Sequence, residues 1–285
     1  MKAKKNTSEF ISEIDRSIHN IKNIKDLAAL LFQENSKLDK FTIIKQGENI
    51  GGFSNPYLTQ RISQPYKCFP GSKVVRMEDY ADMKPLSFNL FEAIVKRRSV
   101  REYENYDISL NEIYNILQYS YGITDCQPIR GSKGMWSYRA VPSGGALYPL
   151  EIYIYINNGM IPKGMYHYRA DLNALEFINE EVEMTDFQRI LVAEPYIQLK
   201  NASCIIFISS VLERSLLKYG ERGYRFILQE VGYVAQNISL ICTALRLGSC
   251  MVGSFIDDEM NEIIKVDGVL ETIQSVIVVG KNHEV

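Results

Sequence analysis

Histidine and cysteine are scarce in this chain, and their scarcity limits the kinds of site that it can form. Its 285 residues include three histidines and five cysteines, and no two cysteines have the Cys-x-x-Cys spacing. Metal sites built from His and Cys draw most of their ligands from these two residue types, so such a site is not expected. Three of the cysteines lie among apolar residues, which is typical of reduced thiols in a core.

Long apolar runs and a strong charge of one sign are also missing. No uninterrupted apolar stretch approaches the ~20 residues of a membrane span. The basic start, Met1–Lys5, is followed by polar Asn6–Glu9, where a signal peptide needs an apolar run. The formal net charge of -2 gives no reason to expect nucleic acid or an anionic membrane as a partner. We therefore expect a cytoplasmic protein.

The glycines do not form a nucleotide-binding fingerprint. The chain has no Gly-x-Gly-x-x-Gly after a predicted strand and no Gly-x-x-x-x-Gly-Lys-Ser/Thr. Neither a Rossmann dinucleotide site nor a P-loop is therefore indicated.

The chain is predicted to divide near residue 85. With 46% hydrophobic residues it can bury one large core and carry a smaller appended region. Residues 8–34 repeat apolar positions at helical spacing, which predicts a helix or a pair of helices. Residues 35–85 lack this periodicity and contain Gly51-Gly52 and Pro70-Gly71, so we expect a loop-rich arm with at most short strands. The predicted domains are an extension, 1–85, and a folded domain, 86–285.

Helices and strands alternate irregularly in the second part. Capping boxes at Ser109–Glu112 and Thr185–Gln188 predict two helix starts. A long apolar helix is expected from Tyr224 to Leu245, stopped by Gly248. Further helices are expected at 88–95 and from about 257, strands at 151–156, 203–211, 250–252 and 275–279, and a hairpin at 164–178. This irregular order favours an α+β fold over a doubly wound parallel sheet.

An arginine cluster follows the first of these helices. Arg97, Arg98 and Arg101 lie within five residues, with Ser99 between them. Arginine offers bidentate donors to a phosphate, and the serine hydroxyl adds another donor. The alternative is a solvated basic helix end, where cations also complement the helix dipole.

A glycine-containing loop precedes the strand at 151–156. Ser143-Gly144-Gly145 is flanked by Pro142 and Pro149. Glycines let backbone N–H groups approach a ligand closely, and the two prolines stiffen the loop. The alternative is an ordinary tight turn before the strand.

Lys218 and Tyr219 stand side by side before the long predicted helix. Both are proton-transfer groups whose pKa values change with burial and neighbours, so the pair is a candidate acid/base pair at a helix entrance. Lys-Tyr dipeptides are also common on protein surfaces, where they are inert.

The order of the motifs resembles the nitroreductase superfamily, and within it the SagB-type dehydrogenases of thiazole/oxazole-modified peptide biosynthesis. The resemblance covers about residues 56–281. Its upstream edge is Pro65-x-Lys67-x-Phe69-Pro70-Gly71. The matching blocks are Arg-Arg-Ser-x-Arg at 97–101, Pro-Ser-Gly-Gly-Ala-x-Tyr-Pro at 142–149, Gly-Met-Tyr-His-Tyr at 164–168, Gly232-x-x-x-Gln236-Asn237, and Leu-Gly-Ser-Cys-Met-Val-Gly at 247–253.

This resemblance implies a nitroreductase-like α+β fold, with a central, mostly antiparallel sheet wrapped by helices. It also implies a homodimer with FMN at the dimer interface. The positions matched to the cofactor are Arg97, Arg98, Ser99 and Arg101 for the phosphate and ribityl chain, Lys281 as a second phosphate contact, and Ser143, Gly144, Gly145, Gly253 and Ser254 for the isoalloxazine ring.

The azoline dehydrogenases of this branch carry a Lys-Tyr motif that is essential for catalysis, and it matches Lys218-Tyr219. The implied reaction oxidises thiazoline or oxazoline rings of a ribosomally made precursor peptide to thiazoles or oxazoles. A proton leaves the former α-carbon and a hydride leaves the former β-carbon for the flavin. The base is either Tyr219 as a phenolate, its pKa lowered by the Lys218 ammonium, or Lys218 itself when it is desolvated.

The implied partners are the precursor peptide and a cyclodehydratase complex. Two alternatives stay open: a nitro- or quinone-reducing flavoenzyme fed by NAD(P)H, and a subunit of a peptide-modifying complex without turnover. The remaining residues are given either a structural role or a choice between a structural role and a ligand contact. His167 is interpreted as a strand histidine, Trp136 and Tyr138 as a peptide groove or core, Tyr148 as packing, and Gln236-Asn237 as an interhelical hydrogen bond or a flavin contact.

Overall fold

The computed structural model describes residues 28–63, 66–77, 87–131, 133–193 and 195–282. They belong to two compact units, Met1–Lys45 and Gln46–Val285. The first unit contains helix α2 (Ala28–Asn35), which confirms the predicted helix over 28–34. The rest of that prediction, 8–27, lies outside the described residues. Asp39 accepts hydrogen bonds from the N–H groups of Phe41 and Thr42, at 2.8 Å each, where helix α3 (Thr42–Gly52) begins.

The prediction of a loop-rich arm over 35–85 was wrong in its first half. Helices α3 and α4 (Pro56–Ile62) occupy much of it, and only β1 (Lys73–Arg76) is the short strand that was expected. Gly51 and Gly52 form the last turn of α3, where glycine is tolerated. Asn55 caps α4 by accepting from the Tyr57 N–H at 2.9 Å, and Pro56 takes the first helical position. The domain boundary near residue 85 stays a prediction.

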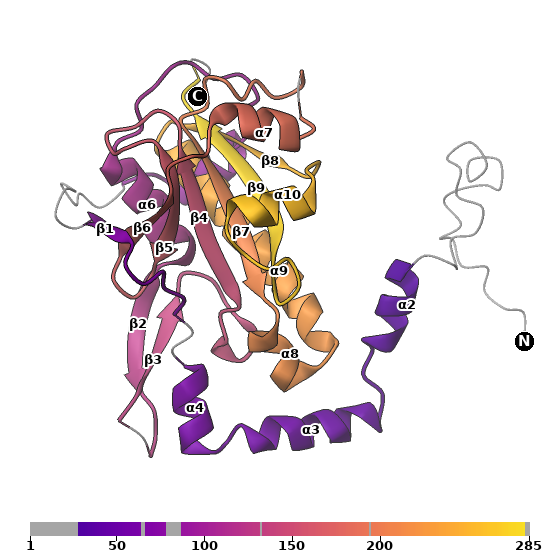
Figure 1. Cartoon of the computed structure of the whole chain (residues 1–285). Coiled ribbons are helices and arrows are strands. Elements are labelled where there is room, and N and C mark those ends of the chain that lie inside the picture. Colours follow the sequence, from indigo (N-terminus) through magenta and orange to yellow (C-terminus); the bar gives the residue numbers. More distant parts are fainter. Residues whose placement is uncertain (1–27, 64–65, 78–86, 132, 194, 283–285) are drawn as a thin grey trace, which may run out of the picture. The chain divides into compact units, whose positions relative to one another are not determined.

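A seven-stranded sheet organises the second unit (Figure 1). Its order is β1-β6-β5-β4-β7-β9-β8, and every pair of neighbouring strands is antiparallel. The remaining strands are β4 (Leu150–Ile156), β5 (Gly164–Arg169), β6 (Ala174–Asn179), β7 (Cys204–Val211), β8 (Gly248–Val252) and β9 (Glu271–Gly280). This topology confirms the α+β class, and a second sheet pairs β2 (Ile123–Pro128) with β3 (Met135–Arg139).

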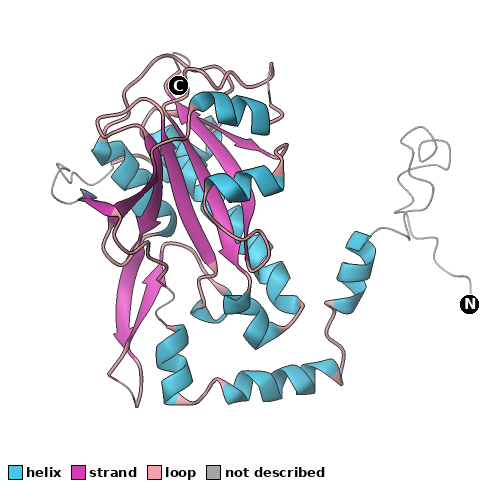
Figure 2. Cartoon of the chain, in the orientation of Figure 1, coloured by secondary structure: helices cyan, strands magenta, loops and turns pink. Residues whose placement is uncertain are grey.

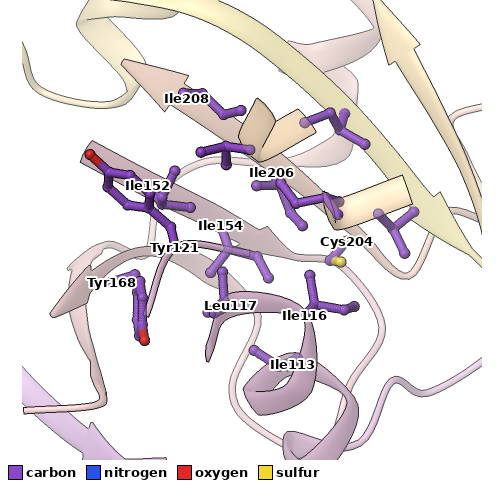
Figure 3. Packing of buried hydrophobic residues seen from close by; sticks show 14 of the residues in the cluster. Ile113, Ile116, Leu117, Tyr121, Ile152, Ile154, Tyr168, Cys204, Ile206 and Ile208 are labelled. Carbon is purple, nitrogen blue, oxygen red and sulfur yellow. The ribbon is translucent and has the colours of Figure 1, made fainter. Parts of the chain in front are cut away.

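Helices cover both faces of the large sheet (Figure 2). On one face, α6 (Leu110–Tyr121) and the 23-residue α9 (Arg222–Ala244) bury apolar side chains against the even-numbered residues of β4 and β7. Figure 3 shows Ile113, Ile116 and Leu117 of α6 facing Ile154 and Ile206. On the other face, α7 (Met184–Ile190) and α10 (Asp257–Ile263) contact the odd-numbered residues of the same strands. Because successive side chains of a strand point to opposite faces, β4 and β7 contribute to a core on each face of the sheet.

The helix boundaries confirm one predicted capping box and correct another. Ser109 and Glu112 exchange both capping hydrogen bonds at the start of α6, which ends at Gly122 as predicted. The box at Thr185–Gln188 was wrong: α7 begins at Met184, and the Asp186 carboxylate accepts from the Glu183 N–H at 2.9 Å. Carboxylates can fill the capping position as well as hydroxyls, so the start lies two residues earlier.

Gly248 does not stop the long helix, which ends at Ala244. Gly248 is instead the first residue of β8, and a Cβ built on it would lie 2.6 Å from a side-chain carbon of Val100. The glycine is therefore required by the close approach of the segment that follows α5 (Leu90–Lys96). None of the described helices is both long and apolar enough to cross a membrane.

Candidate functional site

Lys218 and Tyr219 form the last turn of α8 (Glu213–Tyr219), which follows β7. They precede the long helix, as the sequence shows, but belong to a separate short helix. Gly220 then adopts a φ of 55°, and α9 begins at Arg222. The turn at Gly220 places the end of α8 next to the start of α9. The side chains of Lys218 and Tyr219 are both half-buried.

The Ser143-Gly144-Gly145 loop contacts this pair. A Cβ built on Gly145 would lie 2.4 Å from the Tyr219 hydroxyl oxygen and 2.8 Å from Lys218 Nζ. A Cβ on Gly144 would lie 3.0 Å from a ring carbon of Phe226, in the first turns of α9. The loop forms the short 3-10 turn η3 (Gly144–Ala146), in which Gly145 has a φ of 65°. Two motifs that are distant in the sequence therefore meet at one site.

Two further residues at this site lie in the segment that was predicted as a loop. The Phe53 ring centre is 5.9 Å from Lys218 Nζ, and Gln46 Nε2 donates to the Tyr219 carbonyl at 3.4 Å. On the other side, the Phe226 ring meets the Tyr219 ring edge-on at 5.0 Å. The sequence reasoning missed Phe53 and Gln46, because no motif marks them and α3 was not predicted.

Burial shifts both pKa values in the direction that favours the neutral form of each group. Desolvation lowers the pKa of the Lys218 ammonium and raises the pKa of the Tyr219 phenol. This contradicts the expectation that the lysine lowers the pKa of Tyr219. Of the two bases considered from the sequence, a desolvated Lys218 amine is therefore the one that this environment favours.

The arginine cluster lies elsewhere, beside the start of β8. Ser99 forms a parallel bridge with Ser249, and the Val100 N–H donates to the Ser249 carbonyl at 3.0 Å. Arg97 caps α5, while Arg98, Ser99 and Arg101 are exposed. The last three line an open cavity of about 620 Å³ whose lining also includes the acidic Glu102 and Glu104, together with Gln198 and Asn282.

The cavity offers donors to an anion. Within the described part of the chain, the side chains of Arg98 and Arg101 donate to nearby backbone carbonyls, at 2.8 to 3.3 Å. Among the residues that the structure describes, no acidic side chain forms an ion pair with Arg97, Arg98 or Arg101. Guanidinium and hydroxyl donors in this arrangement suit a phosphate.

The other matched positions are dispersed. Gly253 follows the far end of β8, and a Cβ built on it would meet nothing within 4 Å. The carbonyl of Ser254 accepts from the Val192 N–H at 3.0 Å. Lys281 follows β9, and its ammonium donates to the Arg246 carbonyl at 2.6 Å. That ammonium is therefore bonded to main chain rather than pointing into the arginine cavity.

Helix α9 separates the two groups of residues within one chain. Gly144 lies against Phe226 near its start, whereas Arg98 shares a second cavity with Thr243 near its end. Seventeen residues of α-helix span about 26 Å at 1.5 Å per residue. In Figure 1, α8 accordingly lies at the lower end of the sheet and the arrowhead of β9 at the upper end.

The residues given structural interpretations lie as follows. His167 is fully buried in β5, with its two ring nitrogens 3.0 Å from Glu151 and Glu176, so it is a paired strand histidine as expected. Tyr148 is buried with its ring edge-on to Tyr121 at 6.3 Å. Trp136 and Tyr138 are half-buried on β3, and Gln236 and Asn237 are on α9, the first exposed and the second half-buried.

Comparison with known proteins assigns the chain to a family. The model of the Nitroreductase family matches residues 94–281, and the chain belongs to this family. The protein MJ1384 of Methanocaldococcus jannaschii, whose name places it with the nitroreductases, is 35% identical over 67% of this chain and 89% of its own length. Among solved structures, a nitroreductase-class protein of Anabaena variabilis has a TM-score of 0.68 at 22% identity, over 88% of this chain and 45% of its own.

Two similar proteins are named for peptide processing. The trifolitoxin-processing protein TfxB of Rhizobium leguminosarum is 28% identical over 62% of this chain, and the microcin B17-processing protein McbC of Escherichia coli is 30% identical over 45% of it. The matches span 48% and 49% of those proteins, about half of their length. The solved E. coli microcin synthetase complex McbBCD contains a chain with a TM-score of 0.55 at 18% identity, over 87% of this chain and 98% of that one.

Replacing Gly145 by Ala tests the contact between the loop and the pair. Tyr219 and Lys218 meet the added Cβ only with the flexible ends of their side chains, so we expect both ends to move while the fold persists. Gly71→Ala is a matched control, because its φ of 84° carries the same backbone strain and its Cβ meets nothing within 4 Å. We expect both variants to lose about 1–2 kcal/mol of unfolding free energy, and a crystal structure to show displaced side-chain ends only in Gly145→Ala. Undisturbed Lys218 and Tyr219 positions in that crystal structure would count against the contact.

Proposed function

We propose that this chain is an FMN-dependent dehydrogenase that oxidises thiazoline or oxazoline rings in a ribosomally made precursor peptide. The observation that carries the proposal is the contact of Gly145 with Lys218 and Tyr219, in a member of the Nitroreductase family. A proton-transfer pair beside a loop with accessible backbone N–H groups is what aromatisation of an azoline requires. The names of TfxB and McbC support a peptide substrate, and the McbBCD microcin synthetase complex, with truncated pro-MccB17 bound, supports a role within a peptide-modifying complex. The cyclodehydratase as partner is part of this proposal.

The residues present fit FMN. The exposed donors of Arg98, Ser99 and Arg101 suit its phosphate and ribityl chain, together with Arg97. Ser143, Gly144 and Gly145 would line the isoalloxazine ring, and the open space over Gly253, beside Ser254, suits its other edge. Lys281 stays a weaker proposal for the phosphate, since its ammonium is bonded to Arg246. FMN, when bound, supplies the hydride acceptor.

In the proposed reaction, Lys218 removes the proton from the former α-carbon of the azoline. Desolvation leaves a larger fraction of its amine neutral at a given pH, because the pKa lies below its ordinary value. Tyr219 keeps its proton, since burial raises its pKa, and its hydroxyl is placed to donate a hydrogen bond to the ring of the substrate. The ring of Phe53 lies beside Lys218 and the ring of Phe226 beside Tyr219, and both contribute to this partial burial.

A second copy of the chain completes the proposed site. Gly144 contacts Phe226 near the start of α9, and Arg98 shares a cavity with Thr243 near its end, about 26 Å further along the helix. We therefore propose that one flavin contacts the loop of one chain and the arginine cavity of the other. Apolar side chains are exposed beside the arginine cluster on α5, where Phe91 is 76% and Val95 69% exposed. Leu228 and Tyr233 on α9 are each 44% exposed. Exposed apolar side chains of this kind suit a symmetric homodimer.

A nitro- or quinone-reducing enzyme fed by NAD(P)H is the second candidate, and the similarity to MJ1384 favours it. That role needs no Lys-Tyr pair, because the substrate takes the hydride directly. Rapid reduction of the bound flavin by NAD(P)H would support it.

The purified protein is expected to be yellow and to release FMN, not FAD, on denaturation. Replacing Arg97 and Arg101 by Ala should strip the flavin, because charge and bidentate donors are both lost. Arg61→Ala, on α4 and away from the cavity lining, is the control and should keep full occupancy. Flavin content is read from the absorbance of the released cofactor. Full flavin occupancy in the double variant would show that the FMN phosphate binds elsewhere.

The protein is expected to sediment as a dimer. A charge at the exposed apolar surface, in Phe91→Glu, should weaken association and flavin binding together, because both use this surface. Val269→Glu, at a residue that is 70% exposed outside α5 and α9, should change neither. Sedimentation velocity with detection at a flavin wavelength checks this. Monomers that still bind FMN fully would contradict the shared site.

Lys218→Ala and Tyr219→Phe should each abolish azoline oxidation while flavin stays bound. Loss of a general base typically lowers the rate by about 10²–10⁴-fold, and the double variant should be little worse than either single variant. The wild-type rate should rise with pH through the pKa of Lys218, which lies below its ordinary 10.5. The measurement is single-turnover flavin bleaching by an azoline peptide without oxygen, with Tyr196→Phe, at an 81% exposed residue, as control. Bleaching near the wild-type rate in both single variants would contradict the role of the Lys-Tyr pair and would favour a nitroreductase that does not use it.

A further inference from the structure

Arg214 joins helix α8 to the loop that contacts the Lys218-Tyr219 pair. It lies in the first turn of α8, and its Nη1 donates to the carbonyl of Tyr148, at the end of the loop, at 3.3 Å. One turn further along the helix, Lys218 lies on the same face and reaches Gly145. One face of α8 therefore contacts the loop twice, first at Tyr148 and then at Gly145.

The antiparallel pairing of β4 and β7 brings the loop and the helix together. Leu150 pairs with Ser210, at the start of β4 and near the end of β7. The loop before β4 and the helix after β7 therefore leave the sheet at the same place. A hydrogen bond from the Val211 N–H to the Pro149 carbonyl, at 2.8 Å, closes this junction. Arg214, three residues beyond Val211, continues the contact with its side chain.

The loop is strained where Arg214 binds it. Ala146 has a φ of 52° and Tyr148 a φ of 45°, a region that residues with a Cβ rarely adopt. Strained backbone of this kind persists only where surrounding contacts hold it. The Tyr148 N–H donates to Ser143 Oγ at 2.9 Å, and the Tyr148 hydroxyl accepts from the Arg139 N–H at 3.0 Å. The bond from Arg214 to the Tyr148 carbonyl is the contact that ties this strained backbone to α8.

The other terminal nitrogen of Arg214 is fixed by a buried carboxylate. Nη2 lies 2.6 Å from Glu151 Oε1 on β4, and the two side chains are 15% and 5% exposed. Burial raises the pKa of Glu151, but Arg214 and His167 outweigh this effect and hold that pKa at about 2. Glu151 is therefore ionised at neutral pH, and the ion pair attaches the arginine to the sheet.

Glu151 is itself held by a chain of buried charges. One ring nitrogen of His167 lies 3.0 Å from Glu151, and the other lies 3.0 Å from Glu176. A neutral imidazole has one N–H, so two carboxylate partners require a protonated ring. Glu176 in turn accepts from Arg169 at 2.8 Å. Positive and negative groups thus alternate from Arg214 to Arg169 across β4, β5 and β6, and they keep Glu151 in place.

We propose that Arg214 is a positioning residue that holds the Ser143–Gly145 loop at the distance from α8 at which Lys218 and Tyr219 contact it. One terminal nitrogen attaches the arginine to the sheet, and the other binds the carbonyl at the end of the loop. The planar fork of a guanidinium can hold two acceptors in a fixed geometry. The effect of this placement on catalysis rests on the proposed function.

Arg214→Lys tests the fork without removing the charge. An ammonium is a single point charge that should stay on the Glu151 carboxylate, so the Tyr148 carbonyl loses its partner while the fold persists. Arg169→Lys is the matched control. Arg169 belongs to the same chain of charges and is 16% exposed, but it pairs with residues of β6 and of the turn before it. Urea unfolding should show a similar loss of stability in both variants.

The placement of the pair is measured on flavin-free protein. The ¹³Cζ signal of Tyr219 is followed by NMR in tyrosine-labelled protein, and it is identified by its absence from Tyr219→Phe. Because the Tyr219 ring contacts Phe226 and the loop, we expect Arg214→Lys to shift this signal and Arg169→Lys to leave it in place. Arg214→Gln, which is shorter and uncharged, is a second variant and should shift it as well. An unshifted signal in the Arg214 variants, or an equal shift in Arg169→Lys, would overturn the proposal.

Catalysis is measured by flavin bleaching with an azoline peptide, in the presence of excess FMN. A displacement of about 1 Å can lower a rate about 10²-fold, so kcat should fall by about this factor in Arg214→Lys while KM is unchanged. Arg169→Lys should keep the wild-type kcat. A wild-type kcat in Arg214→Lys, or an equal loss in both variants, would overturn the proposal. A wild-type protein that the peptide does not bleach would instead refute the proposed function, and the Tyr219 signal would still decide the role of Arg214.

Discussion

The packing of α9 across the sheet is the constraint on which the rest of the structure depends. Ile227, Val234 and Ile238 have no exposed surface and lie in the same cluster as α6 and the even-numbered residues of β4 and β7. Each such side chain contributes about 1.5–3 kcal/mol on burial. Because the helix is anchored along its length, its two ends lie at different places. The glycine loop and the Lys-Tyr pair lie near its start, and Arg98 of the arginine cavity lies near its end.

Chemistry at the first place follows from close contact and burial. Gly145 has no Cβ, and this lets the ends of the Lys218 and Tyr219 side chains reach the loop. Half-burial between aromatic rings then favours the neutral amine and the neutral phenol. Lysine as base and tyrosine as hydrogen-bond donor is the division of roles that these shifts favour.

Much of the fold could be predicted from the sequence, because the local patterns agreed with the tertiary structure. The capping box at Ser109 and the alternating residues of 151–156 and 203–211 each led to the observed element. The failures have physical causes. Gly51 and Gly52 suggested a loop, but they form the last turn of a helix. Gly248 suggested the end of a helix, but its missing Cβ instead leaves room for the side chain of Val100.

The candidate site was less predictable than the fold. Motif order pointed to Lys218-Tyr219 and to the Ser143–Gly145 loop, and the structure brings these together. Their pKa directions could not be predicted, because burial by Phe53 and Phe226 depends on packing that no motif marks. The placement of the loop and of Arg98 near opposite ends of α9 also depends on packing.

The central claim, a site shared by two chains, is tested most directly by a hybrid dimer. One chain carries Arg97→Ala and Arg101→Ala, the other carries Lys218→Ala, and different affinity tags allow the hybrid to be purified. Each parent homodimer should be inactive in azoline oxidation. If each site combines the arginine cavity of one chain with the lysine of the other, the hybrid has one intact site and about half of the wild-type activity. An inactive hybrid that still forms a dimer would show that both groups serve the same site within one chain, and would contradict the account.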